Sequence, residues 1–324
     1  MKTPDHWSKR NFTSEALVLV SVFYFIFLRL KYLFCKKGEK LSVPVICVGN
    51  ITAGGAGKTP TAIAIAKILK SKHKKPAFVS RGYGGSIKQA TKVDIENHTS
   101  KQVGDEPLIL VQTAPCYIAA NRVDAANLAI KEGADIIILD DGMQNPSIKK
   151  DLSINVIDGG FGFGNELLIP AGPLRDKKKI ALSKADISII IGDDKKSIEE
   201  NLPEGMRVFH AEISPSNKKK PSKKVNYIAF AGIGRPGKFF ESLGREGLKI
   251  VQRISLPDHY NYNKNDLIEL ENLAKDNDAK LITTQKDAIK LPEEFKKQIF
   301  IFNIAVKFDD EKSIKNIIKE FTGI

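Results

Sequence analysis

The segment Thr52–Thr59, with the sequence TAGGAGKT, has the residue types that bind the phosphates of a nucleotide. Glycines let successive backbone N–H groups turn towards phosphate oxygens, the lysine reaches the β- and γ-phosphates, and the threonine hydroxyl holds Mg²⁺. An apolar run precedes the segment and a helical pattern follows it, which favours a phosphate-binding loop (P-loop) over a chance glycine-rich turn. Thr52 replaces the first glycine of the general motif. The predicted ATP-binding residues are Thr52, Ala53, Gly54, Gly55, Ala56, Gly57, Lys58 and Thr59.

Two adjacent aspartates, Asp140 and Asp141, directly follow the apolar run Asp135–Leu139. In α/β sheets ligands bind at the carboxyl ends of strands, where a carboxylate can organise Mg²⁺. Neighbouring side chains at a strand end point to opposite sides, so the two aspartates should have different functions. A solvated Asp-Asp-Gly turn is the alternative. The P-loop upstream favours a metal site made by Thr59, Asp140 and Asp141.

Three further polar segments follow apolar runs or precede helical patterns. Ser80–Gly84 contains Arg81, whose guanidinium could clamp a phosphate. Asp105, in the sequence GDEP, is placed to cap the N-terminus of a helix. His259 lies in the polar and aromatic turn PDHYNY after the apolar run Leu248–Leu256, although a single histidine is more often structural.

Strand-like and helix-like segments alternate along most of the chain, with a helical pattern at Thr59–Lys70. Continuously apolar strands that alternate with helices predict an α/β fold with a parallel sheet covered on both faces. The polar, basic segment Ser216–Lys224 suggests a linker, so we expect a second, smaller α/β unit after residue 220. The predicted ranges are 1–40 for an N-terminal helix and basic flank, 41–220 for a P-loop domain, and 221–324 for the smaller domain. The predicted strands are Pro44–Val48, Pro76–Ser80, Asp135–Leu139, Leu152–Asp158, Asp186–Gly192, Val225–Ala231, Leu248–Leu256, Lys280–Thr284 and Gln298–Val306.

The N-terminal segment Ala16–Leu28 is apolar except for Ser21 and the Tyr24 hydroxyl, and basic residues follow it. A bilayer span needs about 20 apolar residues, and this run is shorter. It therefore favours a helix in the membrane interface whose basic end (Arg29, Lys31, Lys36, Lys37 and Lys40) faces anionic headgroups. A buried core helix and a single tilted span are the alternatives.

The composition limits the classes of partner. The net charge of +13 and the pI of about 9.4 indicate an acidic partner, namely nucleic acid, an anionic membrane surface or a phosphorylated substrate. Basic residues gather near the N-terminal helix and in the linker and are not interleaved with aromatic residues, so we expect no nucleic-acid partner. Three cysteines, Cys35, Cys47 and Cys116, are too few for a disulfide framework and indicate a reducing compartment.

Two other patterns resemble nucleotide motifs. The segment Gly232–Gly237 fits G-x-G-x-x-G, but Pro236 stiffens the loop, and Asp258, which lies near the required spacing, stands in the unlike context PDHY. Asn263–Asp266 has the letters of a guanine-specificity motif, but it opens an apparent surface helix. We therefore expect neither a dinucleotide site nor a GTPase.

An ordered set of motifs resembles the tetraacyldisaccharide 4'-kinase family, which phosphorylates the 4'-hydroxyl of the lipid A precursor. Most of these motifs are weak alone, but the full series in sequence order is specific. This family also accepts Ser or Thr at the position of Thr52. The matching segments are VGNITAGGAGKTP (48–60), SRGYGG (80–85), GDEP (104–107), LDDGMQ (139–144), PAGPLR (170–175), FAGIGRPGKFF (230–240), LPDHY (256–260) and TTQKDAIKL (283–291).

The resemblance implies transfer of phosphate from MgATP to a lipid disaccharide at the cytoplasmic face of the bacterial inner membrane, by a peripheral or monotopic enzyme with no obligate protein partner. It implies that Asp105 is the general base for the sugar hydroxyl and that His259 orients it. Arg81, Tyr83 and Arg175 would contact the substrate or its phosphates. Asn145 departs from the family pattern, which commonly has histidine there, so Asn145 receives no catalytic role. The alternative function is a P-loop NTPase that acts as a nucleotide-driven switch or chaperone.

Overall fold

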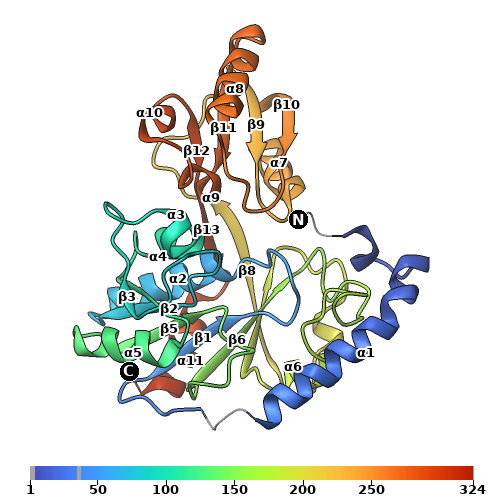
Figure 1. Ribbon diagram of the computed structural model, residues 1–324, viewed down its shortest axis with the longest axis vertical. Coiled ribbons are helices and arrows are strands. Elements are labelled where there is room, and N and C mark those ends of the chain that lie inside the picture. The colour runs from blue at the N-terminus through green and yellow to red at the C-terminus, as the bar shows by residue number, and fades with distance from the viewer. Residues whose placement is uncertain (1–3, 35–37, 324) are drawn as a thin grey trace.

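The structure is a computed structural model that describes residues 4–34 and 38–323 of the chain. Cys35, Lys36 and Lys37, which belong to the predicted basic flank, lie outside the described residues. The described strands form one sheet of nine strands and one of four. We call the nine-stranded sheet and its helices the first unit, and the four-stranded sheet with its helices, residues 225–303, the second unit (Figure 1).

The sheet of the first unit has the order β13-β8-β7-β6-β1-β5-β2-β4-β3. The central strand β1 is parallel to β5 and β6, with Val48 opposite both Asp140 and Ile154. Among the described strands of this sheet, only β3 and β13 run antiparallel to their neighbours, so the predicted parallel α/β sheet is confirmed except at its two edges. The strands are β1 (Val45–Gly49), β2 (Pro76–Ser80), β3 (Thr91–Lys92), β4 (Cys116–Ile118), β5 (Ile136–Asp140), β6 (Leu152–Asp158), β7 (Ile187–Ile191), β8 (Arg207–Pro215) and β13 (Ile304–Phe308).

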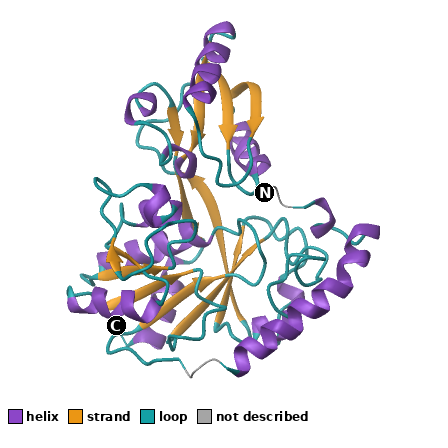
Figure 2. Cartoon of the chain, viewed as in Figure 1, coloured by secondary structure: helices purple, strands orange, loops and turns teal. Residues whose placement is uncertain are grey.

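Helices cover both faces of this sheet (Figure 2), which explains why its strands β1, β2, β5 and β7 are buried along their whole length. In β1, Ile46 and Val48 pack into the core beneath α2, α4 and α11. Val45 and Cys47 point to the opposite core, beneath α5 and α6. The helices of the first unit are α2 (Lys58–Ser71), α3 (Ser100–Val103), α4 (Asp105–Leu110), α5 (Arg122–Lys131), α6 (Lys178–Leu182) and α11 (Glu311–Thr322).

The second unit has a parallel sheet of order β10-β9-β11-β12. Phe239, Phe240 and Leu243 of α7 pack on one face of this sheet, and Leu270 of α8 and Phe295 of α10 pack on the other. The strands are β9 (Asn226–Ala231), β10 (Lys249–Ser255), β11 (Ala279–Thr284) and β12 (Phe300–Phe302). The helices are α7 (Pro236–Arg245), α8 (Lys264–Asp276), α9 (Gln285–Ala288) and α10 (Glu293–Lys296).

The C-terminal part of the chain returns to the first unit, which corrects the predicted range 221–324. The single strand expected over 298–306 is divided at Asn303, whose N–H donates to Asn217 Oδ1 and whose carbonyl accepts from the Ser216 N–H. These bonds to the linker interrupt the ladder, and β13 pairs with β8 in the first sheet. The helix α11 then packs into the first core.

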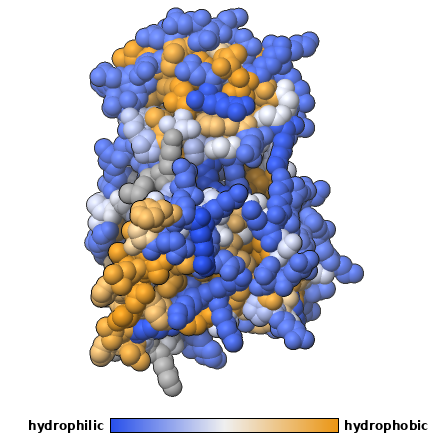
Figure 3. Space-filling view, turned by 90° about the vertical axis from the view of Figure 1, so that its right-hand side faces the viewer, coloured by the Kyte–Doolittle hydropathy of each residue, from blue (hydrophilic) through white to orange (hydrophobic). Residues whose placement is uncertain are grey.

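The N-terminal helix α1 (Phe12–Leu33) has 22 residues and is therefore longer than the predicted apolar run. It is long and apolar enough by length and composition to cross a membrane. One side of α1 lies against the first unit, where the Ser21 hydroxyl donates to Leu168 O (2.8 Å) and the Tyr24 hydroxyl to Arg175 O (2.9 Å). The opposite side of α1 faces outwards, and Figure 3 shows a broad apolar area on the face of the molecule where α1 lies. The exposed apolar residues of α1 include Leu19, Phe23, Ile26, Phe27 and Leu30.

Candidate active site

The predicted P-loop connects β1 to α2. Gly57 is the N-cap residue of α2 and has a φ of 92°, and Gly54 has a φ of 114°. Side chains with a Cβ rarely adopt such angles, so both positions require glycine. The helix begins at Lys58, one residue before the predicted start, and its N-terminus is a favourable place for a phosphate.

The first residues of the loop are anchored by the segment that precedes α6. The Ala53 N–H donates to Pro173 O (2.7 Å), and the Arg175 N–H donates to Ile51 O (2.9 Å). The Thr52 hydroxyl accepts a hydrogen bond of 3.3 Å from the Asn50 side chain. The Ala53 N–H is therefore engaged with the protein in this structure.

Lys58 points towards the end of β5. Its Nζ donates to Asn50 Oδ1 (3.1 Å) and lies 3.5 Å from Asp141 Oδ2. Burial lowers the pKa of Lys58, although the nearby Asp141 carboxylate acts in the opposite direction. Asn50 was not among the predicted site residues. Its position as a polar residue just after an apolar run is the signal that could have identified it.

Asp140 and Asp141 have different partners, as predicted for side chains on opposite sides of a strand end. Asp140 is buried, and its Oδ2 accepts a hydrogen bond of 3.0 Å from Thr59 Oγ1. Its Oδ1 is buried without a hydrogen-bond partner. Burial, together with the adjacent Asp141 charge, raises the pKa of Asp140 to about 7.

Asp141 follows β5 with a left-handed backbone (φ 54°) and pairs with cations. Arg175 Nη1 lies 2.9 Å from its Oδ1, and Arg122 Nη2 donates to its carbonyl (3.1 Å). Burial favours the neutral acid, but Lys58 and Arg175 outweigh it and hold the pKa of Asp141 below the ordinary value. Arg122 was not predicted. The adjacent carboxylates thus differ: Asp141 is an ionised partner of basic side chains, and Asp140 is a buried group with one unsatisfied oxygen.

These oxygens fit a magnesium ion. Within residues 4–34 and 38–323, no three His, Cys, Asp or Glu side chains gather into a metal cluster. Mg²⁺ does not need one, since it binds through one or two carboxylates and completes its shell with water and phosphate oxygens. The unpartnered Asp140 Oδ1 and the neighbouring Thr59 hydroxyl are hard oxygen donors of this kind.

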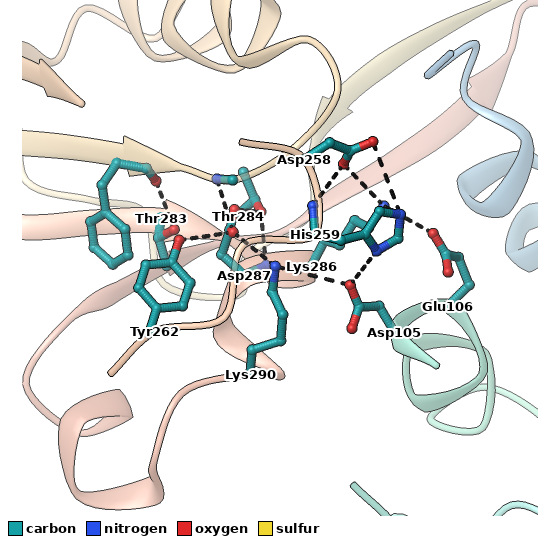
Figure 4. Close-up of polar contacts among 12 residues, drawn as sticks. Asp105, Glu106, Asp258, His259, Tyr262, Thr283, Thr284, Lys286, Asp287 and Lys290 are labelled. Carbon is teal, nitrogen blue, oxygen red and sulfur yellow. Dashed lines mark hydrogen bonds and ion pairs between the residues drawn. The ribbon is translucent and has the colours of Figure 1, made fainter. Parts of the chain in front are cut away.

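Asp105 and His259 meet across the two units (Figure 4). His259 Nδ1 donates to Asp105 Oδ2 at 2.8 Å. The predicted cap was wrong, because Gly104 is the N-cap residue of α4 and the Asp105 side chain bonds to His259 instead. Burial raises the pKa of Asp105, but the His259 hydrogen bond and the Lys290 charge outweigh it, and the pKa is lowered.

The other predicted substrate residues lie near these groups. The exposed Tyr83 ring is 6.0 Å from the His259 ring, measured between centroids. Arg81 follows β2 and is exposed. The burial of Arg122 lowers the pKa of Arg122, and the nearby Arg81 charge lowers it further. No described contact joins Arg81 to the Asp105–His259 pair.

The P-loop and the Asp105–His259 pair belong to one electrostatic site. Glu106, next to Asp105, forms an ion pair of 2.9 Å with Lys286 of the second unit. The Glu106 charge also acts on Asp140, where it adds to burial and to Asp141 in raising the pKa. A phosphate-binding loop, paired aspartates and an Asp–His pair are therefore gathered at the carboxyl edge of the first sheet.

Comparison with known proteins identifies this arrangement. The family model described as Tetraacyldisaccharide-1-P 4'-kinase matches residues 13–322. The chain belongs to this family. A tetraacyldisaccharide 4'-kinase of Rhodospirillum rubrum is 38% identical over 322 residues, which are 98% of this chain and 97% of the relative. One of Paramagnetospirillum magneticum is 40% identical over 310 residues, 95% of each chain.

A solved structure agrees with the family assignment. A crystal structure of LpxK from Aquifex aeolicus in complex with ATP superposes with a TM-score of 0.77 and 26% identity, and the match covers 95% of this chain and 99% of the other. The resemblance inferred from the motifs is thereby confirmed, as are the fold class and the assignment of the chain as a kinase.

The kinase has a second contact between its units, beside the P-loop. Asp158, buried at the end of β6, forms ion pairs with Arg235 and Lys238 of the second unit. The Arg235 guanidinium also lies 4.4 Å from the centroid of the Phe161 ring. Asp158, Phe161 and Arg235 line a small pocket together with residues 52–56. Asp158, Phe161 and Arg235 were not among the predicted site residues. The one sequence signal for them is that Asp158 stands at the end of an apolar strand.

Proposed function

We propose that this kinase transfers the γ-phosphoryl group of ATP to the 4'-hydroxyl of a tetraacyldisaccharide 1-phosphate in lipid A biosynthesis. The family match over residues 13–322 supports this function. The structural observation that carries it is the 2.8 Å hydrogen bond between Asp105 and His259, beside a P-loop. A site for phosphoryl transfer to an alcohol needs such a base near the phosphate loop, whereas hydrolysis alone does not need a lipid acceptor.

The P-loop and Lys58 bind the phosphates of ATP. Gly54, Gly55 and Gly57 let the backbone approach the phosphates, and the N-terminus of α2 adds a favourable dipole. Lys58, which contacts Asn50 and Asp141, is the cation that binds the β- and γ-phosphates. Asp141 holds the basic side chains of Lys58 and Arg175 in place.

Asp140 and the Thr59 hydroxyl would hold Mg²⁺, with Asp141 next to them as the partner of Lys58 and Arg175. The ion supplies positive charge that neutralises the phosphate oxygens. Binding of a cation would ionise Asp140, because it satisfies the buried Oδ1 that has no partner in the protein.

Asp105 accepts the proton of the 4'-hydroxyl. Its Oδ2 is bonded to His259 Nδ1, which leaves Oδ1 to accept the hydrogen bond from the sugar hydroxyl. The low pKa of Asp105 keeps it ionised and able to orient the hydroxyl while the phosphoryl group transfers. Tyr83 beside His259 is placed to contact the sugar, and Arg81 and Arg175 to contact phosphate groups.

The helix α1 binds the membrane surface and brings the site to its lipid substrate. Its inner side is joined to the first unit at Ser21, at Tyr24 and at Arg29, which pairs with Asp176. A helix joined to the protein along its length cannot also be surrounded by lipid, so it lies in the interface with its exposed apolar side in the acyl boundary. We place the enzyme at the cytoplasmic face of the bacterial inner membrane as a monotopic protein.

The deciding experiment is incubation of the purified protein with γ-labelled ATP, Mg²⁺ and lipid A disaccharide 1-phosphate. We expect label in a 4'-phosphorylated lipid, and we expect Lys58→Ala to abolish it. The exposed Lys67 of the same helix provides the matched control, Lys67→Ala, which should keep full activity. Release of free phosphate without a lipid product would support the alternative, an NTPase switch, which the family match does not favour.

A further inference from the structure

Lys290 is a buried cation between the two units. Its side chain is 3% exposed, and its Nζ lies 3.9 Å from Asp105 Oδ2 and 3.4 Å from Asp287 Oδ1. The Nζ also lies 5.7 Å from the centroid of the Tyr262 ring, but it has no hydrogen-bond partner. A buried ammonium is costly unless nearby charges compensate it, so this position needs an explanation.

Asp287 holds Lys290 from the side of the second unit. Asp287 is fully buried, and its carboxylate accepts hydrogen bonds from the Gly232 N–H (2.9 Å), the Tyr262 hydroxyl (2.9 Å) and the Thr284 hydroxyl (2.7 Å). Figure 4 shows this group of side chains with Lys290 between Asp287 and Asp105. The second unit thus presents one fixed positive charge to the base in the first unit.

We propose that Lys290 is a positioning residue for Asp105, whose carboxylate it keeps ionised and correctly placed through its own attachment to Asp287. The proposal rests on the proposed function, in which Asp105 is the general base. Lys290 acts through Asp105 and does not touch the substrate.

The groups around Asp105 support this role. His259, Lys290 and Lys286 face it from the second unit, and Glu106 is its neighbour in α4. Burial favours protonation of Asp105, and the His259 hydrogen bond and the Lys290 charge are the two largest opposing effects on its pKa. Lys286 is occupied with Glu106 at 2.9 Å and with His259 Nε2 at 3.3 Å. Lys290 is shared between Asp287 of the second unit and Asp105, and Asp105 is its one described ion-pair partner in the first unit.

One consequence is that both stabilising partners of Asp105 arrive with the second unit. Lys286 donates to Nε2 of His259, which leaves Nδ1 as the nitrogen that donates to Asp105. Lys290 follows Lys286 by four residues and lies in the turn directly after α9. A base whose ionisation depends on this segment is ready only when the two units are in contact.

The test compares Lys290→Met with Lys290→Arg and with Lys297→Met, a control at a 70% exposed lysine beyond α10. We expect Lys290→Met to lower kcat by about 10- to 100-fold at neutral pH with KM for ATP unchanged. The acid limb of its pH–rate profile should move up by about one pH unit, so that the loss of kcat is larger at acid pH than at neutral pH. Lys290→Arg should recover most of kcat, and Lys297→Met should match the wild type.

A direct titration separates this proposal from the proposed function. In protein labelled with [4-¹³C]aspartate, the Asp105 signal is identified by its loss in Asp105→Asn. It should titrate about one unit higher in Lys290→Met than in the wild type, whether or not phosphoryl transfer occurs. If Lys290→Met does not fold, the double variant with Asp287→Asn keeps the buried charges balanced and should show the same rise. An unchanged Asp105 titration, or a pH profile that falls equally at all pH values, would overturn the role of Lys290.

Discussion

Asp105 and His259 are 154 residues apart in the chain, yet His259 Nδ1 donates to Asp105 Oδ2 at 2.8 Å. Asp105 begins α4 of the first unit, and His259 follows β10 of the second unit with a left-handed backbone (φ 59°). The bond therefore exists only when the units are in contact. The proposed base and its histidine partner come from different units, and neither unit contains both residues.

The Asp105–His259 pair should behave as one unit in kinetics. We expect Asp105→Asn and His259→Gln each to lower kcat by about 10²- to 10⁴-fold, because each removes the oriented base. The double variant should lose little more than either single variant. Phosphoryl transfer to the lipid measures all three, with His73→Asn as a control, since His73 is exposed and Asn tolerates its left-handed backbone. Additive losses would show that the two residues act independently.

Asp140→Asn should lower activity but stabilise the metal-free protein. The folded-state pKa of about 7 is above the unfolded value, so the fold loses stability as pH rises from about 4 to 7 and the deprotonated carboxylate remains buried above that. Without metal, the variant should gain up to about 4 kcal/mol of unfolding free energy at pH 8 and almost none at pH 4.

With Mg²⁺, Asp140→Asn should need at least about tenfold more Mg²⁺ for half-maximal activity, because a charged ligand is lost. Chemical denaturation at the two pH values and a Mg²⁺ titration measure both effects. The control is Asp193→Asn, at a 77% exposed carboxylate. Equal stability changes at pH 4 and pH 8 would contradict the raised pKa.

Asp158→Ala should loosen the contact between the units. It leaves Arg235 and Lys238 without their buried partner, so we expect a loss of about 1–3 kcal/mol in unfolding free energy. Hydrogen exchange should increase in β6 and α7, and kcat should fall because Asp105 and His259 separate more often. Glu320→Ala, the control, removes the exposed ion pair with Arg207 and should leave the free energy of unfolding nearly unchanged. If hydrogen exchange in α7 is unchanged in the variant, Asp158 does not hold the two units together.

Negative charges introduced on the exposed side of α1 should release the enzyme from membranes. Phe23 and Phe27 are 65% and 67% exposed, and burial of each ring in lipid contributes about 1.5–3 kcal/mol. Phe23→Glu with Phe27→Glu should therefore abolish flotation with anionic vesicles, while activity on detergent-dispersed lipid persists. Ile268→Glu, at an exposed position on α8, should float like the wild type. Continued flotation of the α1 variant would place the membrane contact elsewhere.

The sequence predicted the parts of the site that are local. The P-loop is a continuous segment whose glycines, lysine and threonine are sufficient to define a phosphate-binding turn. Asp140 and Asp141 were found for a similar reason, because they end an apolar strand. The strands β1, β2, β5, β6 and β7 and the helix α2 were placed to within about a residue, since these strands are buried along their whole length. The strands β3, β4 and β8 were not predicted.

The return of the C-terminal residues to the first sheet was not predicted. Hydrophobic periodicity shows that a strand exists but not which sheet it joins. The chain between Phe300 and Phe308 is apolar on both sides of Asn303, and only the hydrogen bonds of Asn303 to the linker divide it into β12 and β13.

By itself, the sequence determined the fold class, the P-loop and, through the ordered motifs, the family and the residues Asp105 and His259. Only the tertiary structure decided how those residues are paired: Asp140 with Thr59, Asp141 with Arg175, Asp105 with His259 and Lys290, and Asp158 with Arg235. Charge pairing acts over a few ångströms, whereas these partners are tens to more than a hundred residues apart. The distances of the first two pairs are fixed by the folding of the first sheet, and those of the other pairs by the contact between the two units, and sequence spacing records neither.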